Sequence, residues 1–129
     1  MGIDLELEQQ VIGIKLAIKL KRLGVRQGSY FVWYKEELLS RNNLPDNLDV
    51  NDVFAAFTSQ ELGWMLPKGA ECDGIKFYLG MDKLNEDWEI WYENSDGVKW
   101  KDCYMGTNNE AHNRGYILSV LLENGAIPN

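Results

Sequence analysis

The side chains best suited to covalent chemistry lie close together near the end of the chain. Cys103 supplies a thiol, Asp102 a carboxylate and His112 the chain's single imidazole, which together can activate a cysteine nucleophile. A small thiol-dependent hydrolase that uses Cys103 and His112 is therefore one alternative. A surface histidine and a packed thiol account for the same residues without catalysis. We predict that the protein is not an enzyme and assign it no catalytic residue.

The sequence contains no pattern typical of a metal or cofactor site. Cys72 and Cys103 lack the Cys-x-x-Cys spacing of a zinc site or a redox dithiol. The acidic segment 82–89 has Leu84 where a calcium-binding loop needs an oxygen ligand. Carboxylate pairs are expected by chance in a chain with 20 acidic residues. We therefore predict neither a metal nor a cofactor.

Aromatic residues are unusually frequent, with five Trp, six Tyr and four Phe among 129 residues. Strands are predicted at 75–79, 88–93 and 98–104, and side chains alternate between the two faces of a strand. Tyr78 and Trp91 then lie on one face of the sheet, and the hydrophobic residues of their own strands lie on the other face. If helices cover one side of this sheet, both rings are exposed among charges, as is typical of protein interfaces. We predict a binding surface made of Tyr78, Glu89, Trp91, Glu93 and Lys101. A second layer or a homodimer would instead bury this face.

The last two of these strands form a predicted hairpin around residues 95–97. A three-residue loop with a left-handed Gly97 pairs Glu93 with Lys99, and we favour it because it places the aromatic residues on one face. Its weak point is that Asp102 then lies opposite Ile90. The same register pairs Tyr92 with Trp100 and Trp88 with Tyr104.

Three helices are predicted, and two of them begin with the same signature. Thr-x-x-Glu, in which Thr caps the helix and Glu reaches back to the Thr backbone, occurs at 58–61 and 107–110. The first helix is indicated by the helical period of its apolar residues, although Gly13 weakens its first turn. The helices are expected at 8–23, 58–66 and 107–124, with Gly24, Pro67 and Gly125 directly after them.

The remaining segments complete the expected fold. Residues 29–35 are predicted as a strand with a partner at 37–40, residues 41–52 as a loop excursion, and residues 53–57 as a short apolar segment. The pattern predicts a single α+β domain over residues 1–129. We expect a mostly antiparallel sheet of about four to six strands, with the first and last helices packed on one face.

The charge is unevenly distributed along the chain. The formal net charge is −7, and residues 42–129 alone carry six Lys or Arg against fifteen Asp or Glu. Because an acidic domain is repelled by phosphate backbones, nucleic acid is not an expected partner. The apolar run 11–20 is interrupted by two lysines, which argues against a signal peptide or a membrane span. We therefore expect a cytoplasmic protein.

Three segments of the chain carry a resemblance to other proteins. They are KLKRLGVRQGSYFVWY (19–34), FTSQELGWMLP (57–67) and TNNEAHNRGYILSVLLENG (107–125). In this order they resemble a loose group of small phage- and prophage-encoded proteins of gut bacteria, whose function is unknown. The resemblance implies a phage or mobile-element origin and a location in the host cytoplasm. It implies no catalytic residue.

These observations together predict a binding function. We expect a non-enzymatic accessory protein that binds a host or phage protein through an acidic, aromatic-bearing surface. An alternative is a protein that mimics the charge of nucleic acid and inhibits a host defence protein or DNA-binding protein.

Overall fold

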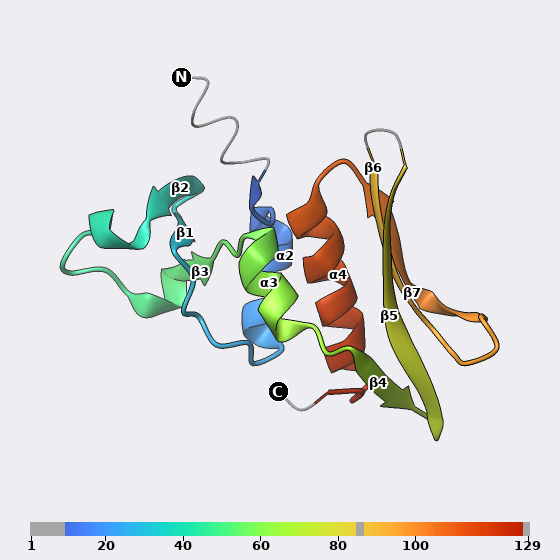
Figure 1. Ribbon diagram of the computed structural model, residues 1–129. Coiled ribbons are helices and arrows are strands. Elements are labelled where there is room, and N and C mark those ends of the chain that lie inside the picture. Colours follow the sequence, from blue (N-terminus) through green and yellow to red (C-terminus); the bar gives the residue numbers. More distant parts are fainter. Residues whose placement is uncertain (1–9, 85–86, 128–129) are drawn as a thin grey trace.

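The computed structural model describes residues 10–84 and 87–127, in which three α-helices lie between two antiparallel sheets (Figure 1). The helices are α2 (Ile14–Arg22), α3 (Ser59–Met65) and α4 (Glu110–Glu123). The strands of the first sheet, in spatial order, are β2 (Glu37–Ser40), β1 (Phe31–Tyr34) and β3 (Val53–Ala55). Those of the second are β4 (Gly69–Cys72), β5 (Ile75–Leu84), β6 (Asp87–Glu93) and β7 (Lys99–Thr107). The predicted α+β class is confirmed, and the strands divide between two sheets.

The three-stranded sheet contains the predicted hairpin, in which β1 and β2 pair along their whole length. Lys35 and Glu36 form its two-residue turn with φ angles of 50° and 65°, which is the geometry of a type I′ turn. The loop predicted at 41–52 contains two short 3₁₀ turns, η1 (Arg41–Asn43) and η2 (Val50–Asp52), neither of which has a buried residue. This excursion therefore adds little to the core.

The four-stranded sheet has helices on one side. α4 packs on β6 and β7, while α2 and α3 pack on α4 in the next layer (Figure 1). The described helices leave the other face of this sheet uncovered, and we call it the outer face. Trp88 and Trp91 lie on opposite faces of β6, as predicted from the alternation of the strand.

The β6–β7 hairpin turns as predicted, but its register is then interrupted. Glu93 pairs with Lys99, and Gly97 has a φ of 80°, as the three-residue loop requires. Farther along, the predicted pairing of Trp88 with Tyr104 is wrong, because Trp88 pairs with Thr107. A bulge shifts β7 relative to β6 in the region between Trp91 and Glu93. The predicted pair of Tyr92 with Trp100 is lost in the same bulge, which occupies residues 100–103 of β7.

The bulge has a physical reason in the order of side chains along β7. Trp100 and Cys103 both pack toward the core, and the two residues between them, Lys101 and Asp102, are both exposed. Strict alternation would bury one of these charges opposite Ile90, which is 2% exposed. The bulge keeps both charges in water and gives Ile90 an apolar partner, Met105.

The first helix begins later than predicted, after Gly13. The backbone of Gly13 is extended, with φ −71° and ψ 166°, and no side chain caps the helix there. Before it, Val11 forms a β-bridge with Thr58, and the Ile12 N–H donates to the Phe57 carbonyl at 3.0 Å. Residues 8 and 9 lie outside the described residues. The predicted end is confirmed, since Gly24 follows the helix with a φ of 90°.

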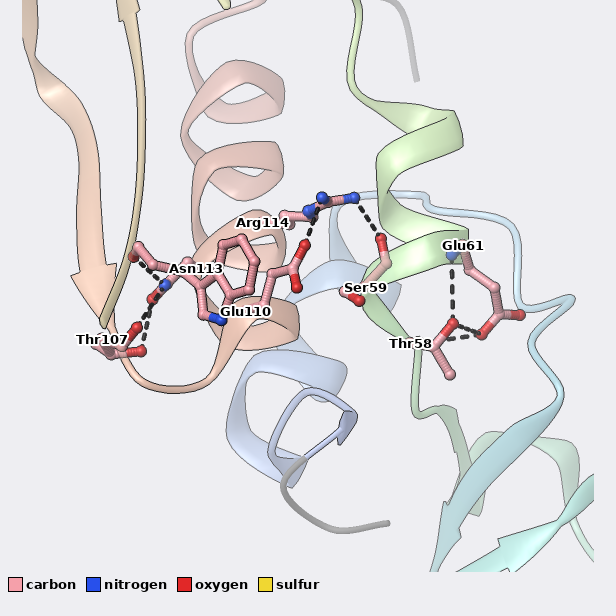
Figure 2. Close-up of polar contacts among 8 residues, drawn as sticks. Thr58, Ser59, Glu61, Thr107, Glu110, Asn113 and Arg114 are labelled. Carbon is pink, nitrogen blue, oxygen red and sulfur yellow. Dashed lines mark hydrogen bonds and ion pairs between the residues drawn. The ribbon is translucent and has the colours of Figure 1, made fainter. Parts of the chain in front are cut away.

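The two predicted capping boxes have different outcomes. At α3 the box is formed: the Thr58 hydroxyl accepts from the Glu61 N–H, and the Glu61 carboxylate accepts from the Thr58 N–H (Figure 2). At α4 the prediction is wrong, because Thr107 is the last residue of β7 and Asn109 caps the helix. The Thr107 hydroxyl instead bonds the Asn113 side chain at 2.6 Å (Figure 2).

The hydrophobic core joins the helices to both sheets. Its fully buried members include Leu20 of α2, Leu62 of α3 and Tyr92 of β6. Helices α2 and α4 approach closely at Gly115, where a Cβ atom would lie 2.9 Å from side-chain carbons of both Ile12 and Leu16. This glycine, unfavourable inside a helix, is therefore explained by packing.

Candidate binding surface

The outer face presents aromatic rings among charged side chains. Tyr78 on β5 pairs with Glu93 on β6, and Trp91 pairs with Gly80 on one side and Tyr104 on the other. Tyr78 is 46% exposed and Tyr104 is 39% exposed. The strand pairings also place charged residues on this face, five carboxylates and two lysines: Glu71, Asp82, Asp87, Glu89, Glu93, Lys76 and Lys99. The face is therefore acidic overall.

The indole of Trp91 lies close to Gly80 of the neighbouring strand. A Cβ atom at Gly80 would come within 2.6 Å of the indole ring, so only glycine leaves room for this arrangement. The indole N–H donates to the Glu93 carboxylate at 2.8 Å. Trp91 is consequently half-buried, and the expectation that it is an exposed side chain is wrong.

Tyr104 is held in a similar way next to Trp91. A hydrogen bond to the Glu89 carboxylate, followed by partial desolvation, raises the pKa of the Tyr104 hydroxyl. A Cβ atom at Gly106 would lie 3.3 Å from Glu89 Cγ and 3.4 Å from the Tyr104 hydroxyl oxygen. Each ring of the pair therefore has a carboxylate at its polar edge. Each also has a glycine close by, Gly80 for Trp91 and Gly106 for Tyr104.

A lysine lies over both rings of this pair. The Lys99 ammonium nitrogen is 4.5 Å from the Trp91 ring centroid and 5.4 Å from the Tyr104 ring centroid, within the range of cation–π interactions. On β5, the Lys76 ammonium lies 5.7 Å from the Tyr78 ring centroid. Every aromatic ring of the outer face named above therefore has a cation above it.

The structure brings together four of the five predicted surface residues. Tyr78, Glu89, Trp91 and Glu93 share the outer face. Lys101 is exposed in the bulge of β7, and Lys99 takes the position over Trp91 instead. Tyr104 was not expected on this face, because a regular β7 pairs it with Trp88 on the inner face. Lys99 was correctly paired with Glu93 but was not assigned to the site. The glycines at 80 and 106 were the available signal, since glycine inside a strand marks a close approach of other groups.

The candidate hydrolase residues are arranged differently from what that alternative requires. Cys103 is fully buried, and this burial raises its pKa to about 12, with smaller contributions from Asp102 and Cys72. His112 lies in the first turn of α4, and in the described residues no hydrogen bond joins it to Cys103. The accessible, activated thiol that the hydrolase alternative needs is therefore not present.

A second aromatic surface lies away from the outer face, around α3. Tyr30 is 61% exposed and Trp64 is 69% exposed, and both line a hollow of about 330 Å³. Glu61 also lines this hollow, but its carboxylate already accepts from the Thr58 and Tyr30 N–H groups. This surface lacks the excess of carboxylates found on the outer face.

Figure 2 shows how α3 and α4 are joined beside this region. Arg114 of α4 donates to the Ser59 carbonyl at 2.8 Å and forms an ion pair with Glu110 one turn earlier. Asn113 faces the other way and donates to the carbonyl of Trp88 on β6. Successive residues of α4 therefore tie it to α3 and to the sheet, which holds the inner face of the sheet in place.

Comparison of the chain with protein-family models, curated proteins and solved structures finds no match. In the part of the chain that the structure describes, no helix has the length and apolar character needed to cross a membrane. Within the same residues, no three His, Cys, Asp or Glu side chains are grouped so that they could hold a metal ion.

Proposed function

We propose that the protein is a non-enzymatic binding protein of a phage or prophage, and that it binds a host or phage protein through the outer face. The observation that carries this proposal is the composition of that face, which has Tyr78, Trp91 and Tyr104 among five carboxylates and two lysines. Aromatic side chains contribute much of the energy of protein interfaces, and an acidic surface attracts a basic partner. The resemblance of residues 19–34, 57–67 and 107–125 supports the phage origin and a place in the host cytoplasm.

Capture of partners from host lysate tests this proposal, with the wild-type protein compared with Trp91→Ala and Tyr78→Ala. Both variants should retain less partner, and capture should weaken at high salt because screening reduces the charge attraction. Thermal unfolding confirms that each variant is folded. Tyr78→Ala is the more secure variant because its ring is already 46% exposed.

Trp64→Ala is the matched control, because Trp64 is the more exposed tryptophan and lies outside the outer face. It should retain the same proteins as the wild type. Loss of capture with Trp64→Ala, together with full capture by Tyr78→Ala and Trp91→Ala, would assign binding to the surface around α3 and contradict the proposal.

The carboxylates of the outer face also favour a second candidate, in which the protein mimics the charge of nucleic acid. The partner would then be a host defence protein or a DNA-binding protein. Competition separates the two candidates: double-stranded DNA added to the capture experiment should release the partner of a charge mimic. It should leave a partner without a DNA-binding surface in place.

A further inference from the structure

We propose that Trp91 and Tyr104 form a cleft for a cationic side chain of the partner, an arginine or lysine in a basic segment, and that Lys99 fills this cleft in the free protein. The inference rests on the proposed function and names the chemistry that the outer face recognises. Binding would replace the chain's own cation with one from the partner.

The position of Lys99 shows that the pair of rings accepts a cation. Its ammonium lies within 5.5 Å of both ring centroids, at 4.5 Å from Trp91 and 5.4 Å from Tyr104. Among the described residues no carboxylate comes within 4 Å of this ammonium, so the rings are its main partners. Lys99 is an exposed side chain, and an exposed ion contact contributes little to stability. Displacing it therefore costs the fold little.

The carboxylates at the ring edges suit a ligand that has several N–H donors. Glu93 accepts the Trp91 N–H through Oε1, and in the described residues its Oε2 accepts no hydrogen bond. Glu89 lies at the edge of Tyr104, whose hydroxyl it binds. A guanidinium group stacked on Trp91 could donate to Glu93 Oε2, a bond that adds to the cation–π contact. The cleft is thus more complete for a partner's arginine than for Lys99.

The two glycines make the cleft a preformed feature. Gly80 lets the indole of Trp91 lie against the strand, and the hydrogen bond to Glu93 fixes its rotation. Gly106 leaves room for Glu89 and the Tyr104 hydroxyl in the same way. Since the rings are already held in place, a ligand does not have to order them, which favours binding.

The test is an NMR titration of the protein with a capped hexa-arginine peptide, which follows the indole N–H signal of Trp91. Lys99→Gln empties the cleft, and we expect it to lower the Kd of the peptide about five-fold relative to the wild type. Lys101→Gln is the matched control because it removes the same charge from the same strand but lies in the bulge. It should change the Kd by less than about two-fold. The signal of Trp91 should shift on peptide addition in all three proteins.

Equal effects of Lys99→Gln and Lys101→Gln would overturn the inference, because the peptide would then respond to net charge alone. A Trp91 signal that stays unchanged at saturating peptide would overturn it as well. Adding Trp91→Leu to Lys99→Gln should abolish the increase in peptide affinity. If the double variant keeps that increase, the inference is contradicted. If Tyr78→Ala and Trp91→Ala lose capture of host proteins while the two lysine variants behave alike, the cleft is refuted. Partner binding through the outer face is then still supported. If the lysine variants differ but capture from lysate is unaffected by Tyr78→Ala and Trp91→Ala, the proposed function fails.

Discussion

The thiol of Cys103 is among the most buried groups of the sheet, and its environment predicts a pH dependence of stability. Burial raises its pKa from 9.0 to about 12 in the folded protein, so the folded thiol stays protonated where the unfolded thiol ionises. Its stabilising contribution is therefore complete below pH 9 and is lost as the pH rises from 9 toward 12. The free energy of unfolding, measured in urea from pH 7 to 10.5, should fall more steeply in the wild type than in Cys103→Ala. Parallel profiles would show that the thiol is not shielded.

Glu61 is another residue whose surroundings predict the effect of a substitution on stability. It is 6% exposed, and its carboxylate accepts three hydrogen bonds. The donors are the Thr58 N–H at 2.9 Å, the Thr58 hydroxyl at 3.0 Å and the Tyr30 N–H at 3.1 Å. Glu61→Ala removes the acceptor of the part-buried Thr58 and Tyr30 N–H groups and should lower the free energy of unfolding by about 2–3 kcal/mol. Gln60→Ala, at the exposed neighbouring position, should change it by less than about 0.5 kcal/mol. Chemical denaturation measures both values, and similar losses in the two variants would contradict the role assigned to Glu61.

Among the elements, the crossing of α2 and α4 makes the clearest prediction. Gly115→Val places methyl groups where even a Cβ atom would lie 2.9 Å from Ile12 and Leu16. Overpacking of this kind costs about 1–3 kcal/mol. Adding Leu16→Ala makes room for the valine, so Leu16→Ala should cost less in the Gly115→Val protein than in the wild type. A double-mutant cycle by thermal or urea unfolding measures this coupling. Additive effects would show that the helices can move apart.

The elements also show which parts of the fold could be predicted from the sequence. The Thr58 capping box and the turn at Gly97 were correct because each depends on residues three or four positions apart. The bulge of β7 was missed because it depends on what the strand meets across the sheet. Lys101 and Asp102 have the character of ordinary strand residues, and the signal of the bulge was the predicted position of Asp102 opposite Ile90. The same error placed Tyr104 on the inner face. Lys99 and Glu93 were paired correctly, and Trp91 and Glu89 were correctly placed on the face of Glu93.

For the molecule as a whole, the structure predicts where the chain can be cut without loss of the fold. The excursion at 41–52 has no buried residue in either of its 3₁₀ turns, and Val50 is 71% exposed. Thermolysin, which cleaves before large apolar residues, should cut first before Val50 or in residues 43–48. The two fragments should stay associated, because the core joins helices and sheets outside this segment.

Mass spectrometry identifies the cut, and size-exclusion chromatography shows whether the fragments remain together. The Lys21 ammonium donates to the Val50 carbonyl at 2.6 Å and to the Val53 carbonyl at 2.9 Å, which anchors the end of the excursion. Lys21→Ala should therefore speed cleavage before Val50. First cleavage within β5 or β6 would show that the four-stranded sheet opens more readily than the excursion.

The contact between Gly80 and Trp91 restricts the order in which the two positions can change during divergence. Alanine is normally better than glycine inside a strand by roughly 0.5–1 kcal/mol, but with Trp91 present its Cβ atom would lie 2.6 Å from the indole. Gly80→Ala should therefore destabilise the wild type and stabilise the Trp91→Ala protein. The sign of its effect on stability thus depends on the residue at position 91. A lineage that loses the tryptophan can then replace the glycine freely, whereas a lineage that keeps the tryptophan cannot. We expect sequences descended from a common ancestor with this protein to retain glycine at 80 wherever they retain tryptophan at 91.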